Sequence, residues 1–239
     1  MRRIVLALLA FALTVWSSGV VSGQGSPDVA AAEVLVRQHY FEGIPYQAAR
    51  GLTPDAVARL AEMLESPEDA PYRANIVMAL GLSGQPGAYE ALAAYAEREP
   101  EGQIEGTESR ARLVIPFAMG HLAQRDQRAL GFLVRAAQPS ARTPRWRHRR
   151  LRNARLGSLL RRGAITGLAI AGRPEAGAVL RALARQTESP QVGPQGAGTR
   201  SSAGSSRARL RRHLDEALTL HSRVSSEGAV RVFGRNPRR

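Results

Sequence analysis

Apolar positions between residues 53 and 186 follow a helical period and recur in matching copies. Three stretches that align without gaps begin at Thr53, Gln85 and Arg173, and a looser copy begins at Gln124. The shared positions are a proline (Pro54, Pro86, Pro174), an alanine (Ala56, Ala88, Ala176) and a leucine (Leu60, Leu92, Leu180). Proline suits the first turn of a helix, where its missing N–H costs nothing, so each stretch predicts a helix start. Thr53 is expected to be an N-cap.

A second apolar helix is predicted before each of three copies, at residues 72–84, 111–123 and 160–172. Equivalent positions hold an arginine (Arg73, Arg112, Arg161) and a large apolar residue (Leu80, Met119, Leu168). Small residues near the helix ends favour close packing and chain reversal (Gly81, Gly84, Gly120, Gly172). A helical hairpin of this size does not bury its apolar face alone, so the copies are expected to stack.

The arginine-to-glycine pattern from Arg73 to Gly81 and the Pro-x-Ala helix starts resemble HEAT repeats, in particular the short bacterial type also seen in phycobilisome lyases. The resemblance covers about residues 53–186, with a worn copy at 28–50, and Pro116 interrupts one first helix. It implies an all-α fold, an α-solenoid of three to four helical hairpins. Such repeats mostly serve as binding scaffolds. A lyase would also need a bilin and a phycobiliprotein partner, which an export signal argues against.

The segments outside the repeats are predicted from composition. Residues 1–23 have two arginines, an apolar run and a small-residue end, typical of a secretory signal cleaved after Gly23. We therefore expect a periplasmic or secreted protein, or a membrane-tethered one if the signal stays uncleaved. The solenoid is assigned to residues 24–186.

The region after the solenoid divides into three predicted parts. Residues 187–207 are rich in glycine, serine and proline and predict a flexible linker. Residues 208–223 predict an amphipathic helix with Leu210, Leu214 and Leu218 on one face. This helix either docks on the solenoid as a cap or binds another molecule, and we favour docking. Residues 224–239 are predicted to be a basic disordered tail.

Charge and composition exclude several kinds of chemistry. The net charge is +14, all 34 basic residues are arginine, and the chain has no cysteine. The absence of lysine excludes a P-loop lysine or a Schiff-base lysine, and the absence of cysteine excludes thiolate chemistry and disulfides. Residues 24–126 hold 8 arginines against 15 acids, whereas residues 127–239 hold 24 against 5. This asymmetry favours a basic interaction surface.

No catalytic, metal or cofactor site is predicted from the histidines and acids. None of the five histidines is followed by glutamate, which argues against a hydroxylase of the HEAT type (His39, His121, His148, His213, His221). His213, Glu216 and His221 share a helix face, but a chance surface pair explains them better than a metal site. His121 is expected to be a partly buried core histidine, because it aligns with Leu82. The acidic clusters at 62–69 and 97–108 are expected to be solvated surface.

An arginine-rich insertion at about residues 139–153 is the candidate binding site. Its residues are Arg142, Arg145, Trp146, Arg147, His148, Arg149, Arg150, Arg152 and Arg155. Arginine forks suit phosphate and carboxylate groups, and one aromatic ring could stack on a base or lie at a lipid headgroup. Three interpretations remain open: a solvated loop, contact with an acidic protein, glycan or lipid surface, or nucleic acid, of which nucleic acid is the least favoured. The insertion could also pair with residues 97–108, within one chain or head-to-tail between chains in a salt-sensitive association.

These observations favour an exported, non-enzymatic HEAT-like scaffold that binds a protein partner through its repeat surface. The alternative is an adaptor for anionic surfaces that acts through the arginine loop. A lyase or hydroxylase built on the repeats is the least favoured hypothesis.

Overall fold

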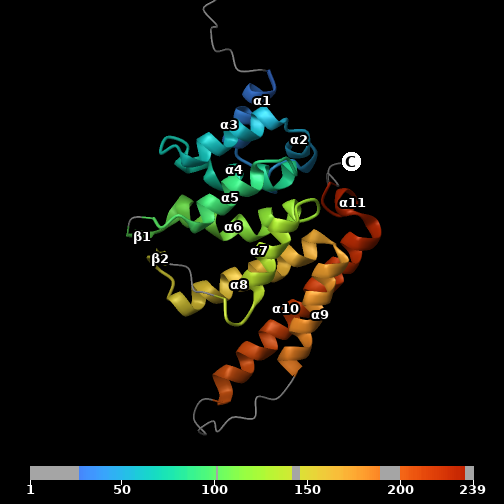
Figure 1. Ribbon diagram of the computed structural model, residues 1–239. Coiled ribbons are helices and arrows are strands. Elements are labelled where there is room, and N and C mark those ends of the chain that lie inside the picture. The colour runs from blue at the N-terminus through green and yellow to red at the C-terminus, as the bar shows by residue number, and fades with distance from the viewer. Residues whose placement is uncertain (1–26, 101, 142–145, 189–199, 235–239) are drawn as a thin grey trace, which may run out of the picture.

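The computed structural model describes residues 27–100, 102–141, 146–188 and 200–234. These residues are mostly helical, which confirms the predicted all-α class (Figure 1). The helices are α1 (Pro27–Arg37), α2 (Tyr46–Arg50), α3 (Pro54–Glu65), α4 (Arg73–Ser83), α5 (Ala88–Glu97), α6 (Gly106–Leu122), α7 (Gln127–Ala137), α8 (Asn153–Ala171), α9 (Pro174–Glu188), α10 (Arg200–Glu227) and α11 (Ala229–Phe233), with a short 3₁₀ turn at Ala70–Tyr72. Two short strands, β1 (Gln103–Ile104) and β2 (Arg147–His148), pair in parallel.

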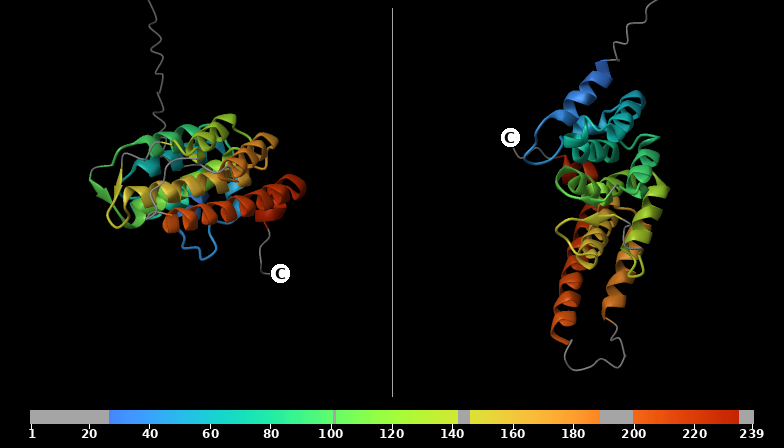
Figure 2. Two further views of the ribbon diagram at one scale, coloured as in Figure 1. Left: turned by 90° about the horizontal axis from the view of Figure 1, so that it is seen from below. Right: turned by 90° about the vertical axis from the view of Figure 1, so that its left-hand side faces the viewer.

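The three helices that carry the repeated arginine pack side by side: α4 with Arg73, α6 with Arg112 and α8 with Arg161. Helix α4 contacts α6, α6 contacts α8, and α10 extends the row by packing on α8 (Figures 1 and 2). The backbones come so close that a Cβ on Gly167 would lie 2.4 Å from the carbonyl oxygen of Pro116, and one on Gly81 would lie 2.5 Å from the Cα of Ala118. Glycine is therefore required at both contacts. Helix α6 continues through Pro116, so the expected interruption is absent.

The helix starts agree with the sequence in two copies and differ in one. Pro54 and Pro174 are the first residues of α3 and α9, and the Thr53 hydroxyl accepts a hydrogen bond from the Ala56 N–H at 3.3 Å. Pro86 does not lie in the first turn of α5. Gly87 has a φ of +86° and the helix begins only at Ala88, because the left-handed backbone at Gly87 separates the proline from the helix.

The C-terminal region is more ordered than predicted. Helix α9 continues to Glu188 and α10 begins at Arg200, so the predicted linker 187–207 is helical at both ends. The predicted helix 208–223 is the centre of α10, which docks on α8 and α9 and buries Leu214, Ala217 and Val224. The predicted disordered tail is wrong as far as residue 234, because Val224 and Phe233 give it apolar contacts.

Four predicted segments fall wholly or partly outside the described residues. They are the signal segment 1–23, the centre of the linker at 189–199, the loop residues 142–145 and the last residues 235–239. Among the described residues, no helix is both long and apolar enough to cross a bilayer.

Helix α11, near the C-terminus, lies against α2, near the N-terminal end of the described residues (Figure 1). The ring centre of Phe233 lies 5.0 Å from that of His121 and 6.3 Å from that of Tyr46, which is on α2. His121 is partly buried, as expected, and burial together with the nearby charge of Arg50 lowers its pKa to about 4. Its Nδ1 atom has no hydrogen-bond partner among the described residues. This aromatic cluster ties the two ends of the stack together.

Candidate functional site: an arginine-lined cleft

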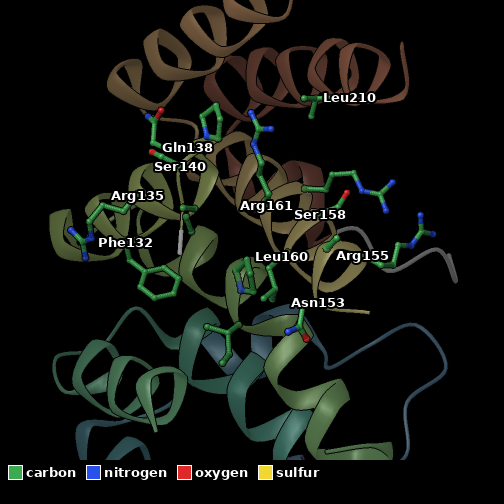
Figure 3. A pocket seen from close by; sticks show the side chains of 18 of the residues that line it. Phe132, Arg135, Gln138, Ser140, Asn153, Arg155, Ser158, Leu160, Arg161 and Leu210 are labelled. Atoms are coloured by element: carbon green, nitrogen blue, oxygen red, sulfur yellow. The ribbon is translucent and has the colours of Figure 1, made fainter. Parts of the chain in front are cut away.

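A cleft with a volume of about 1660 Å³ lies among α6, α7, α8 and α10 (Figure 3). Of the described residues that line it, eight are arginines and only Glu97 is acidic. The arginines are Arg98, Arg112, Arg135, Arg155, Arg161, Arg162, Arg207 and Arg209. Such a concentration of guanidinium groups with low-dielectric walls attracts and holds anions.

Apolar and neutral polar side chains form the rest of the wall. Phe132 comes from α7, Leu160 from α8 and Leu210 from α10, as Figure 3 shows. Polar side chains such as Gln138 and Ser158 lie between these groups. The cleft therefore offers both charge and apolar contact, as a protein-binding surface does.

The repeat arginines have a capping role in two of the three copies. The Arg73 Nε donates to the Leu64 carbonyl at 3.2 Å and its Nη2 donates to the Ser66 carbonyl at 3.2 Å, both at the C-terminal end of α3. In the same way, the Arg161 Nε donates to the Ala137 carbonyl at the end of α7, at 2.8 Å. Carbonyls at a helix C-terminus lack intrahelical partners, so these bonds fasten each hairpin to the previous one.

The middle copy is different. Arg112 is 1% exposed, and its Nε donates to Glu108 Oε1 at 2.8 Å. Its guanidinium carbon lies 5.1 Å from the ring centre of Tyr95 and 5.7 Å from that of Trp146, within the range of cation–π attraction. Its Nη1 and Nη2 have no hydrogen-bond acceptor among the described residues.

Glu108 joins two of the repeat arginines. Its Oε2 accepts from the Arg73 Nη1 at 2.8 Å and from the Tyr95 hydroxyl at 2.8 Å. Burial opposes ionisation of Glu108, but the bonds from Arg112, Tyr95 and Arg73 outweigh it and its pKa is lowered. Burial, followed by the negative charge of Glu108, raises the pKa of Tyr95, whose hydroxyl therefore stays protonated. The expectation that residues 97–108 are only solvated surface is wrong for Glu108, because three side chains enclose it.

The predicted loop contributes little to the cleft. Of the seven candidate residues that the structure describes, only Trp146 and Arg155 line it. Arg147, Arg149, Arg150 and Arg152 are exposed, while the partly buried His148 accepts a hydrogen bond from the Arg150 N–H through Nδ1. Arg142 and Arg145 lie outside the described residues.

Trp146 is not presented to a base or a lipid, contrary to the reading of the loop as an exposed aromatic site. Its side chain is 5% exposed and packs with Ile104 and Leu156 in a small separate core. Burial of its large apolar ring against these residues is favourable, and this fixes the ring in the interior.

The arginine loop and the acidic connection meet within one chain. The Arg149 N–H donates to the Ile104 carbonyl at 3.0 Å, and its guanidinium contacts Glu105 at 2.8 Å. The parallel pairing of β1 with β2 is part of the same contact. Within the described residues, the intramolecular alternative is thus realised, and head-to-tail association between chains stays a prediction.

The C-terminal histidines are used to dock α10. The His213 Nε2 lies 3.0 Å from the Arg162 carbonyl, and the His221 Nε2 lies 2.9 Å from the Arg173 carbonyl. His213 and Glu216 are 3.8 Å apart. In the part of the chain that the structure describes, no group of three metal-ligating side chains gathers.

Sequence reasoning missed Arg112 and Glu108 as a site. A signal was present, because an arginine inside an apolar helix at a repeated position must find a partner.

Comparison of the chain with models of known protein families, with curated proteins and with solved structures finds no match.

Proposed function

We propose that this chain is an exported, non-enzymatic scaffold of stacked HEAT-like hairpins that binds an acidic segment of a partner protein in its arginine-lined cleft. The observation that carries the proposal is the ratio of eight arginines to one acid in the described wall of the cleft. The side-by-side packing of α4, α6 and α8, which hold the matching sequence copies, supports the solenoid arrangement. The composition of residues 1–23 supports export.

The size of the cleft favours a macromolecular segment over a small ligand. Small-molecule sites usually have volumes of about 300–1,000 Å³, and this cleft has about 1660 Å³. Its charged groups also suit binding better than proton transfer. A guanidinium group does not deprotonate in proteins, so these arginines do not act as general bases.

An acidic protein segment fits the walls better than a nucleic acid does. Single strands bind by stacking their bases on exposed aromatic rings. Here Trp146 is buried and Phe132 is partly buried. Apolar side chains of a peptide would instead pack against the partly exposed Phe132, Leu160 and Leu210 while its carboxylates pair with the arginines.

The test is a calorimetric titration with a short glutamate-rich peptide, with a glutamine-rich peptide of equal length as control. A cleft variant carries Arg155→Gln, Arg207→Gln and Arg209→Gln. A loop variant carries Arg147→Gln, Arg149→Gln and Arg150→Gln, so both lose the same charge. All six side chains are exposed, so folding should be preserved in both.

The proposal predicts that only the cleft variant loses affinity, and that wild-type affinity falls as salt rises because exposed charges are screened. Equal losses in the two variants would mean that net charge alone attracts the peptide. Loss in the loop variant alone would favour the adaptor hypothesis. Binding of a single-stranded oligonucleotide in place of the peptide would also overturn the proposal.

A further inference from the structure

Arg112 has donors that the fold does not use. Its two terminal nitrogens, Nη1 and Nη2, are buried, face no acceptor among the described residues and belong to a side chain that lines the cleft. An unsatisfied buried donor is costly, and native structures contain few of them. The equivalent arginines, Arg73 and Arg161, donate instead to backbone carbonyls of the preceding hairpin.

Among the residues that the structure describes, the charges around Arg112 are also one anion short. Glu108 is shared between Arg73 and Arg112, and it accepts a further hydrogen bond from the neutral Tyr95 hydroxyl. One carboxylate thus faces two guanidinium groups that are 14% and 1% exposed. A buried charge needs both a counter-charge and hydrogen-bond partners. A second anion beside Arg112 would supply both.

We propose that Arg112 is the anchor for a single carboxylate of the bound partner, which it holds through Nη1 and Nη2 at the inner end of the cleft. The inference rests on the proposed function and names the group that is recognised. The two terminal nitrogens form the fork that matches the two oxygens of a carboxylate. The rings of Tyr95 and Trp146 both lie close to the guanidinium and limit the space beside it, so a planar carboxylate in the plane of the fork fits better than a tetrahedral phosphate.

The first experiment uses Trp146 as a reporter in the intact chain. The sequence contains two tryptophans, Trp16 and Trp146, so a full-length Trp16→Phe variant fluoresces from Trp146 alone. Sodium acetate is titrated against sodium chloride at matched ionic strength, with inorganic phosphate as a third series. The inference predicts a saturable change in Trp146 emission with acetate only. A response equal to that of chloride, or a response to phosphate but not to acetate, would overturn it.

The second experiment compares two conservative variants with the same glutamate-rich peptide. Arg112→Lys keeps the charge for Glu108 but loses the fork, and Arg73→Lys makes the same change at the equivalent position of the first copy. Affinity should fall about tenfold or more in Arg112→Lys and change little in Arg73→Lys. Equal affinities in the two variants would overturn the inference. If Arg112→Lys does not fold, the acetate titration decides alone.

Two forms of the peptide identify the source of the carboxylate. One has an amidated C-terminus, and the other has a free C-terminus but glutamine in place of glutamate. Binding of the first form points to a side-chain carboxylate, and binding of the second points to a chain terminus. Failure of the inference differs from failure of the proposed function: peptide binding that depends on Arg155, Arg207 and Arg209 but not on Arg112 would leave only the proposed function standing.

Discussion

The first and middle copies of the repeat use the same arginine in opposite ways. Arg73 is built into the fold, since it donates to two carbonyls of α3 and to Glu108. Arg112 shares Glu108, but among the described residues it has no hydrogen bond to the backbone and its terminal nitrogens have no acceptor. A repeated position is thus structural in one copy and free for a ligand in the next.

Two aromatic residues beside Arg112 explain why it is used differently from Arg73. Tyr95 on α5 offers Arg112 a ring where Arg73 finds carbonyls. Trp146, supplied by the arginine-rich insertion, brings a second ring within cation–π distance of the same guanidinium. The insertion contributes to the site through its buried aromatic residue more than through its exposed arginines.

The largest effect is expected at Glu108, the group that the two copies share. Glu108→Gln leaves two buried guanidinium groups without a carboxylate, which should lower the free energy of unfolding by about 3–5 kcal/mol. Urea denaturation at neutral pH measures the loss. Glu105→Gln is the matched control, because that acid has the exposed partner Arg149. Equal small losses in both variants would contradict the network.

His121 and Glu108 each make the free energy of unfolding depend on pH. The pKa of His121 is lowered to about 4 from an ordinary value near 6.5, so between these values the unfolded chain binds the proton and the folded chain does not. Stability should therefore fall by up to about 3 kcal/mol as the pH drops from 6.5 to 4. The lowered pKa of Glu108 acts from about pH 4.5 downward, at the lower end of this range and below it, where protonation of Glu108 removes further stability.

The control for this acid scan is His121→Leu, which places the residue of the first copy, Leu82, at the equivalent position. Denaturation midpoints of this variant should be nearly flat between pH 6.5 and 4. A wild-type slope that persists in His121→Leu would assign the titration to another group.

Replacing either of the two arginines should lower the free energy of unfolding by less than Glu108→Gln does, and the two losses should differ. Arg73→Met leaves the Leu64 and Ser66 carbonyls without their donor and should cost about 2–3 kcal/mol. Arg112→Met should cost clearly less than Arg73→Met, because Glu108 keeps its bonds to Arg73 and Tyr95 while two unused buried donors are removed. Thermal or urea unfolding of the two variants compares them. A larger loss in Arg112→Met would mean that the middle arginine is structural too.

The smallest effect is expected at the surface contact between the loop and the acidic connection. Glu105→Gln removes an exposed ion pair with Arg149, worth at most about 1 kcal/mol. This loss should shrink further in high salt. Sedimentation of wild type at low salt tests the remaining question of head-to-tail association, since a monomer there would exclude it.

The repeat copies predicted the helices well, because helix period, proline starts and small residues are local signals. Among the small residues expected to allow close packing, Gly81 does so against Ala118. The order of the C-terminal region was missed because Val224 and Phe233 acquire apolar contacts only once distant helices are in place. The prediction that Trp146 is an exposed binding residue of the loop failed for a related reason. Exposed arginines are obvious in a sequence, whereas the burial of Trp146 depends on its contacts with Ile104 and Leu156.

The central claim is that Arg112 serves a ligand more than the fold, and a paired measurement on one variant tests it most directly. Wild type and Arg112→Met are compared for the free energy of unfolding and for affinity toward the glutamate-rich peptide. The account predicts a loss of stability clearly smaller than that of Arg73→Met, together with an affinity lower by about tenfold or more. Unchanged affinity, or a loss of stability as large as that of Arg73→Met, would contradict it.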